Sequence, residues 1–174
     1  MKPLNRKLLA GFCALALAVV VTAWFYQRHS DRTRFATAAN QSDLLLTQEY
    51  QISEAVYMHA IQNSEGHPSS SLFFLSKGED GDPDTEVVNR LRRRAYRVKP
   101  VSQSRDEHAV IKDKDTGEPG VILKVGKMTL VDSTRVDVEL SAYSGWGDVK
   151  GYVYHLVRGE NGWVVRDREF AFES

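Results

Sequence analysis

Six side chains in this 174-residue chain could line a small-molecule site, because they combine a carboxylate, hydroxyl groups and imidazoles. They are Glu49, Ser53, Tyr57, His59, Tyr154 and His155. An acid in apolar surroundings has a raised pKa and can exchange protons with a bound molecule. Glu49 and Ser53, four residues apart, fall within the apolar face of a predicted helix, where polar groups need partners. The simpler interpretation is that Glu49 reaches water and that His59 has a structural role.

Metal and cofactor chemistry finds little support in the sequence. Cys13 is the single cysteine and lies in an apolar segment, which excludes a thiolate metal site in the rest of the chain. An acidic loop begins at Asp80 but lacks the glycine and the final glutamate of a calcium-binding loop. We therefore predict no metal and no cofactor. Asp82 is instead expected to cap a helix whose first residue is Pro83 and which ends near Tyr96.

That helix and the residues after it carry a cluster of cations, which we call the basic set. Its members are Arg90, Arg92, Arg93, Arg94, Arg97 and Lys99. Such a cluster can contact an anionic membrane surface or an acidic protein, or it can be a solvated face that pairs with acids of the same domain. Residues 35–174 contain 17 basic and 22 acidic side chains, a net charge of −5. This acidity disfavours nucleic acid as a partner.

The elements that must position these residues begin with a helix from Ser42 to Asn63. Leu45, Ile52, Val56 and Ala60 form one stripe at helical spacing, and a second set widens it. That second set is Leu46, Tyr50, Tyr57 and Ile61. So broad an apolar face predicts that the helix lies in the hollow of a sheet.

The segment from Val121 to Phe172 predicts four strands joined by short turns, which is an antiparallel meander. The apolar residues change parity between Val125 and Met128, which predicts a bulge near Gly126. Asn161-Gly162 marks the last hairpin. A buried strand is expected at residues 72–75, weak strands within 101–105 and 108–112, and core positions for the two phenylalanines of the last strand, Phe170 and Phe172.

The N-terminus predicts a membrane anchor. Leu8–Tyr26 is a run of 19 uncharged residues, about 28 Å long as a helix, and Trp24 and Tyr26 suit the membrane interface. A cleaved signal peptide is the alternative. We expect residues 1–34 to form a cytoplasmic tip, a transmembrane helix and a basic flank. Residues 35–174 then form one domain, expected on the extracytoplasmic (periplasmic) side of a single-pass protein.

This order of elements is α+β, with a curved antiparallel sheet wrapping a long N-terminal helix. Residues 42–172, including Gly162-Trp163-Val164-Val165 before the last strand, resemble the NTF2-like superfamily, which has a cone-shaped fold. The whole chain is also similar to small single-pass bacterial proteins of unassigned role. The superfamily includes isomerases, dehydratases, immunity proteins and dimerisation modules, so the resemblance implies a fold and not one activity.

Two functions are consistent with these patterns. The first is a non-enzymatic, membrane-anchored binding or assembly module that uses the mouth of the cone or the exposed sheet face, near Tyr143 and Trp146, for a homodimer or a protein partner. The second is a small-molecule binder or isomerase-like enzyme that uses the cone interior. Convergence of Glu49 with a tyrosine or histidine on one enclosed cavity favours the enzyme. A cone filled with apolar side chains favours the binding module.

Overall fold

The computed structural model describes residues 43, 45–63, 71–145 and 147–174. Met1–Asp43 and Leu44–Ser174 form separate compact units, and the helices and strands of the fold belong to the second. The predicted anchor, Leu8–Tyr26, lies outside the described residues, and so does Trp146. Within the described residues, no helix has the length and hydropathy that crossing a membrane requires.

A long helix covers residues 45–62 and packs its apolar stripe against the sheet. Ile52 and Val56 are completely buried and Ala60 is nearly so, which confirms the predicted orientation. Leu46 is 74% exposed, so the prediction that it widens the buried stripe is wrong. Leu46 lies in the first turn, where none of the described elements covers that side of the helix.

Six strands form one mostly antiparallel sheet in the order β2-β1-β5-β6-β7-β8. Their bounds are β1 Leu72–Lys77, β2 Val98–Pro100, β5 Gly120–Asp132, β6 Arg135–Gly145, β7 Asp148–Gly159 and β8 Gly162–Glu173. Strands β5 to β8 are the predicted meander. The predicted antiparallel sheet is thus confirmed for the meander, whereas strand β1 runs parallel to both β2 and β5. Parallel strands require a long crossover connection, and the chain between β1 and β5 is long enough for one and contains a helix.

Local irregularities of the meander lie where the residue pattern predicts them. The pairing of β5 with β6 shifts between Val125 and Met128, which is the expected bulge at Gly126. Gly159 pairs with Gly162 in the last hairpin, and Gly162 has a φ of 114°, a conformation that favours glycine. A separate two-stranded sheet, β3 (Ser104–Asp106) with β4 (Ile111–Asp113), follows the short helix η1 (Val101–Gln103).

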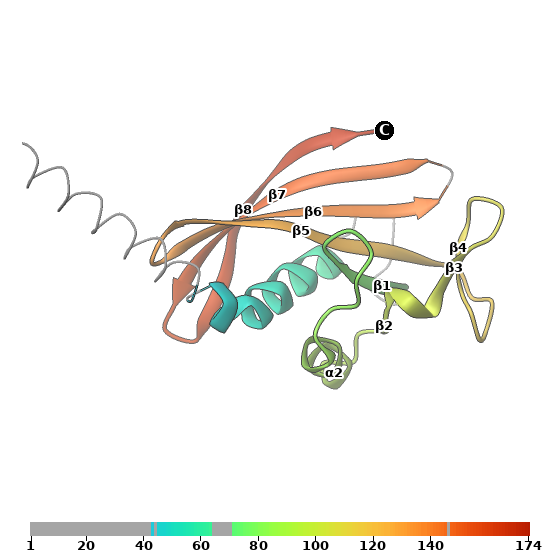
Figure 1. Ribbon diagram of the computed structural model, residues 1–174, viewed down its shortest axis with the longest axis horizontal. Coiled ribbons are helices and arrows are strands. Elements are labelled where there is room, and N and C mark those ends of the chain that lie inside the picture. Colours follow the sequence, from blue (N-terminus) through green and yellow to red (C-terminus); the bar gives the residue numbers. More distant parts are fainter. Residues whose placement is uncertain (1–42, 44, 64–70, 146) are drawn as a thin grey trace, which may run out of the picture. The chain divides into compact units, whose positions relative to one another are not determined.

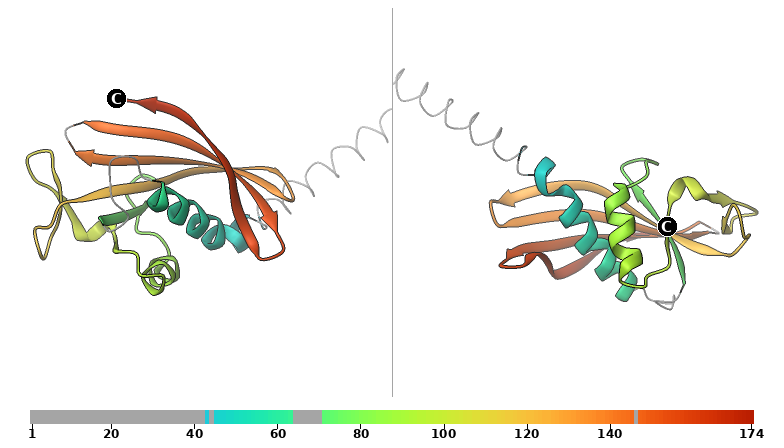
Figure 2. Two further views of the ribbon diagram at one scale, coloured as in Figure 1. Left: turned by 180° about the vertical axis from the view of Figure 1, so that it is seen from behind. Right: turned by 90° about the horizontal axis from the view of Figure 1, so that it is seen from below.

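Helix α2, Thr85–Arg93, lies on the same side of the sheet as the long helix (Figures 1 and 2). Asp84 caps it by accepting a hydrogen bond of 2.7 Å from the amide of Glu86. The predicted start, with Asp82 as the cap and Pro83 as the first residue, is therefore wrong. Asp82 instead accepts hydrogen bonds from the amide and hydroxyl of Ser102. The helix also ends before the predicted Tyr96.

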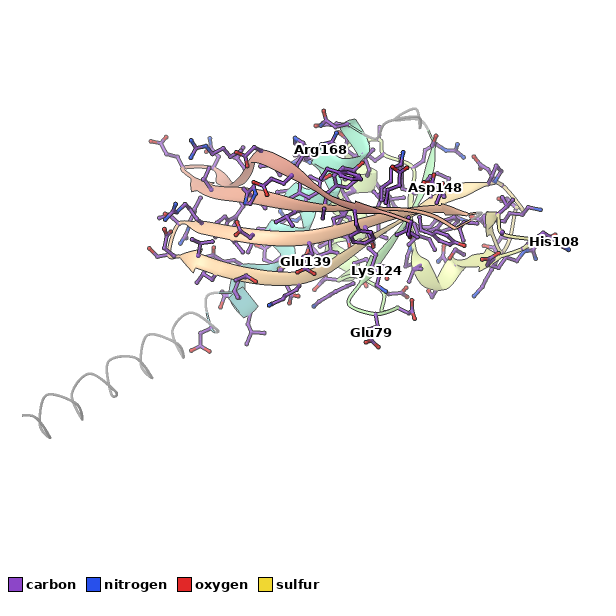
Figure 3. All side chains as sticks on the ribbon, turned by 90° about the horizontal axis from the view of Figure 1, so that it is seen from above. Glu79, His108, Lys124, Glu139, Asp148 and Arg168 are labelled. Atoms are coloured by element: carbon purple, nitrogen blue, oxygen red, sulfur yellow. The ribbon has the colours of Figure 1, made fainter. Side chains whose placement is uncertain are left out.

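The core lies between the two helices and the inner face of the sheet, by which we mean the face that the helices cover. The opposite, outer face carries no helix in the described part of the chain (Figure 3). Phe170 and Phe172 are 58% and 50% exposed, so their predicted place in the core is wrong. Arg168 already reaches Asn63, just past the end of the long helix, and the strand continues beyond the cover of that helix.

Candidate functional site

The six side chains proposed from the sequence do not converge on one enclosed cavity. The carboxylate of Glu49 forms an ion pair of 2.7 Å with Nζ of Lys77, and its side chain is 29% exposed. Glu49 and the buried Ser53 line a recess of only about 100 Å³, beside Pro83 and Val87. This volume is well below the roughly 300 Å³ of a small ligand pocket. Glu49 is thus an acid at the domain surface that pairs with a lysine.

Tyr57 is a structural residue of the core. Its side chain is completely buried, and its hydroxyl donates a 2.6 Å hydrogen bond to the backbone carbonyl of Ser76 in β1. Burial raises the pKa of the phenol far above its ordinary value, so the group stays protonated. The hydrogen bond fixes the long helix to β1 and leaves Tyr57 without a free proton for chemistry.

His59 and Tyr154 do meet, at the C-terminal end of the long helix. Their rings contact edge to face with centroids 5.6 Å apart, and Nδ1 of His59 is buried without a hydrogen-bond partner among the described residues. Burial and the nearby Arg168 cation lower the pKa of His59, so the imidazole is neutral near pH 7. Burial raises the pKa of Tyr154, and a hydrogen bond with Arg168 opposes that shift. The pair does not line the recess that holds Glu49 and Ser53.

His155 faces the other side of the sheet. Side chains alternate along β7, so Tyr154 points to the core and His155 to the outer face. Its Nδ1 donates to Oδ1 of Asp137 at 2.8 Å, and Nε2 lies 3.6 Å from Oε1 of Glu169. The hydrogen bond to Asp137 raises the pKa of His155. The sequence pattern groups His155 with the cone interior because β7 is apolar on both faces, which hides the direction of each side chain.

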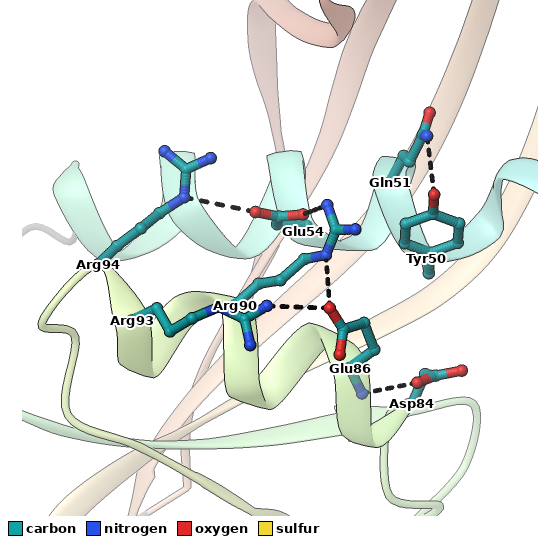
Figure 4. Close-up of polar contacts among 8 residues, drawn as sticks. All are labelled: Tyr50, Gln51, Glu54, Asp84, Glu86, Arg90, Arg93 and Arg94. Atoms are coloured by element: carbon teal, nitrogen blue, oxygen red, sulfur yellow. Dashed lines mark hydrogen bonds and ion pairs between the residues drawn. The ribbon is translucent and has the colours of Figure 1, made fainter.

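Every member of the basic set contacts another group of the domain. Glu86 binds Arg90 and Arg93 at 3.0 and 2.9 Å, and Glu54 lies 3.4 Å from both Arg90 and Arg94 (Figure 4). The remaining three partners are the carbonyl of Val98 for Arg92, Glu118 for Arg97 and Asp113 for Lys99. The basic set thus pairs with acids and a carbonyl of its own domain, which is one of the two arrangements that its sequence permits.

A groove of about 430 Å³ lies on the outer face of the meander. Its lining residues are Lys124, Gly126, Glu139, Leu140, Ser141, Tyr152, Val153, Ala171 and Phe172. The ring of Phe172 lies over Gly151, at a spot where a Cβ would be only 2.2 Å from the ring. The carboxylate of Glu139 lies near Gly126, with Oε2 3.7 Å from where a Cβ would be. Two glycines thus leave room on this face for side chains from the neighbouring strands.

Carboxylates from two strands, β6 and β8, gather beside the groove on either side of β7. In one row across the sheet Asp137 pairs with His155 and His155 with Asp167, and in the next Glu139 pairs with Val153 and Val153 with Glu169. Side chains directly opposite each other in antiparallel strands share a face, so all four acids lie on the outer face. Glu139 and Asp167 form no ion pair within the described residues. The face is therefore acidic and partly unpaired.

No protein family, curated protein or solved structure matches this chain. The site must accordingly be judged on its own residues. Sequence alternation in residues 135–142 already indicates a solvated outer face, but it does not indicate the groove. The apolar pattern assigns Phe172 to the core, and a single sequence gives no signal that Gly151 accommodates that ring. Within the described residues, no three His, Cys, Asp or Glu side chains could hold a metal ion together.

Proposed function

We propose that this protein is a non-enzymatic, membrane-anchored binding module whose protein partner contacts the outer face of the meander. The observation that carries the proposal is the filling of the inner face. Ile52, Val56 and Leu91 from the helices are completely buried against strand residues, in one continuous apolar core. A sheet whose inner face is occupied in this way leaves its outer face as the surface that a partner can reach.

The distribution of paired and unpaired charge supports the same surface. The basic set is engaged within the domain, whereas Glu139 and Asp167 on the outer face form no ion pair among the described residues. The groove beside them also exposes half of Phe172. Exposed apolar area with an adjacent charged rim is typical of a protein interaction site.

The fold and the anchor belong to the same proposal. A long helix against one face of a mostly antiparallel sheet supports an NTF2-like domain, and the uncharged run Leu8–Tyr26 supports a single span with the domain on the extracytoplasmic side. Alkaline extraction of native membranes tests the anchor. The full chain is expected in the membrane pellet, and its release to the supernatant would contradict the anchor.

Photocrosslinking from native membranes tests the binding function. A benzoylphenylalanine residue replaces Val153 at the groove, and in a matched control it replaces Arg93, whose side chain is 63% exposed on α2. We expect a discrete protein adduct from position 153 and none from position 93. Adducts from position 93 alone, or from neither position, would reject the outer face as the binding surface.

One observation favours a second candidate function, a small-molecule site on the inner side. It is the buried Nδ1 of His59, which lacks a hydrogen-bond partner next to Tyr154. A neutral imidazole of this kind can accept a proton from a bound molecule. This candidate would require that His59→Gln and Tyr154→Phe abolish binding of a small molecule that copurifies with the full chain, while the crosslink from position 153 persists.

A further inference from the structure

The groove on the outer face has the dimensions of a side-chain receptor. Its volume of about 430 Å³ falls in the lower part of the range found for ligand pockets, about 300–1,000 Å³. Part of its wall is apolar, because Val153, Ala171 and Phe172 line it. An apolar group that enters it would contact Phe172, which is 50% exposed to water. Burial of that surface favours an aliphatic or aromatic side chain as the occupant.

The negative charge at the groove determines which residues of the partner can lie next to that apolar side chain. Glu139 is itself a lining residue, and Glu169 lies two strands away in the same cross-strand row, with Val153 between them. The next row adds Asp137 and Asp167 around His155. The side chain of Glu169 is 75% exposed, so its carboxylate is accessible to a partner. Complementarity requires cations beside the apolar group.

We propose that this groove binds a protein segment in which a large apolar side chain is flanked by lysine or arginine. The inference rests on the proposed function and specifies its partner. The apolar side chain enters between Glu139 and Phe172, over the space that Gly126 leaves open, and the flanking cations pair with the carboxylates of the two rows.

A second copy of this chain fits the same surface poorly. Face-to-face association would bring the four carboxylates of one sheet close to those of the other, and like charges in an interface are destabilising. Among the described residues, Lys124 is the one cation that lines the groove, and it lies 4.0 Å from Asp80. The excess of acids over cations is therefore compensated only by a basic partner.

The test selects ligands from a phage-displayed library of random dodecapeptides on the full chain in detergent. We expect the selected peptides to contain Lys or Arg within two positions of Leu, Ile, Met, Phe or Trp. A synthetic peptide of the consensus sequence is then titrated by fluorescence anisotropy. Its affinity is expected to fall as salt is raised, because exposed ion pairs are screened.

Two substitutions at the groove and one matched control locate the binding. Gly126→Val adds a side chain at a position where a Cβ meets only ordinary contacts, at 3.5 Å or more. It is expected to weaken binding about tenfold through the loss of one buried side chain. Glu139→Gln should weaken it about threefold, as expected for an exposed ion pair. Glu160→Gln, an exposed carboxylate at the β7–β8 turn, should leave the affinity unchanged.

Four results would overturn the inference: no enriched peptides, enriched peptides without cations, binding insensitive to both groove substitutions, or a dimer that Gly126→Val dissociates. The photocrosslink from position 153 separates this failure from failure of the proposed function. An adduct at 153 together with any of these results leaves the binding module in place and rejects the basic, apolar partner. Absence of the adduct rejects the module itself.

Discussion

Helix α2 and the outer face of the meander both concentrate charge, and they differ in how that charge is used. On α2, Glu54 and Glu86 hold three of the arginines within 3.4 Å. On the outer face, Glu139 and Asp167 have no cation of the described domain within ion-pair distance. A run of six cations is conspicuous in a sequence, whereas carboxylates dispersed over two strands are not. The pairing of a charge, and not its density in the sequence, indicates where a partner can bind.

The largest expected effect is a difference in stability between a substitution on the buried side of α2 and one among the apolar residues of the groove. Leu91 is completely buried, and Leu91→Ala should lower the free energy of unfolding by about 3 kcal/mol, because it leaves a cavity in the core. Phe172→Ala should lower the free energy of unfolding by less than about 1 kcal/mol, since its side chain is half exposed on the surface of the sheet. Urea denaturation of the full chain in detergent measures both values. Equal losses would place Phe172 in the folding core and remove the contrast.

A pair of matched charge removals gives the next largest effect. Glu54 is 8% exposed and accepts contacts from two arginines, so Glu54→Gln should destabilise the domain by about 1 to 2 kcal/mol. Glu139→Gln removes an unpaired carboxylate and should change stability by less than about 0.5 kcal/mol. The same denaturation experiment applies. A larger loss from Glu139→Gln than from Glu54→Gln would reverse the assignment of structural and binding charge.

The arginines that point outward from α2 should be nearly dispensable for folding. Replacement of Arg92, Arg93 and Arg94 by Gln together is expected to cost less than about 1 kcal/mol, because exposed ion pairs contribute little. The adduct at position 153 and the association with liposomes of anionic lipid should both persist unchanged. Loss of either one in a folded triple variant would give the basic set a binding role.

The smallest expected effect is a pH dependence of the outer face. The hydrogen bond to Asp137, with Asp167 and Glu169 nearby, raises the pKa of His155 in the folded protein. The stabilisation by the protonated imidazole is therefore fully present below the unfolded value of about 6.5 and is lost as pH rises through the folded value. Thermal denaturation of the wild type and of His155→Gln should show a gap that is widest below about pH 6.5 and narrows as the pH rises above it. A gap independent of pH would mean that the charge of His155 does not matter there.

Much of the fold is predictable because its signals are local. The apolar spacing of Ile52 and Val56 orients the long helix, and the parity change after Val125 places a bulge. Gly162 marks the last turn. Each of these depends on a few neighbouring residues, whose hydrogen bonds and burial repeat with the period of the element itself.

The wrong predictions concern residues whose partner is distant in the chain. Turn chemistry favours Asp82 as the cap of the next helix, but the hydroxyl of Ser102 takes that carboxylate and Asp84 becomes the cap. His155 faces outward and not toward the helices, and Phe172 lies on Gly151 and not in the core. In each case local chemistry permits both arrangements, and contacts with another element select one.

By itself, then, the sequence determined the elements, their apolar faces and the turns between them, since periodicity and turn chemistry act over a few residues. Only the tertiary structure decided that β1 lies parallel to β5, that the basic set is paired and that a groove opens beside Glu139. These features depend on which surfaces meet after the chain has closed long loops. A local sequence pattern does not indicate which distant residues come into contact, whereas the packed sheet shows it.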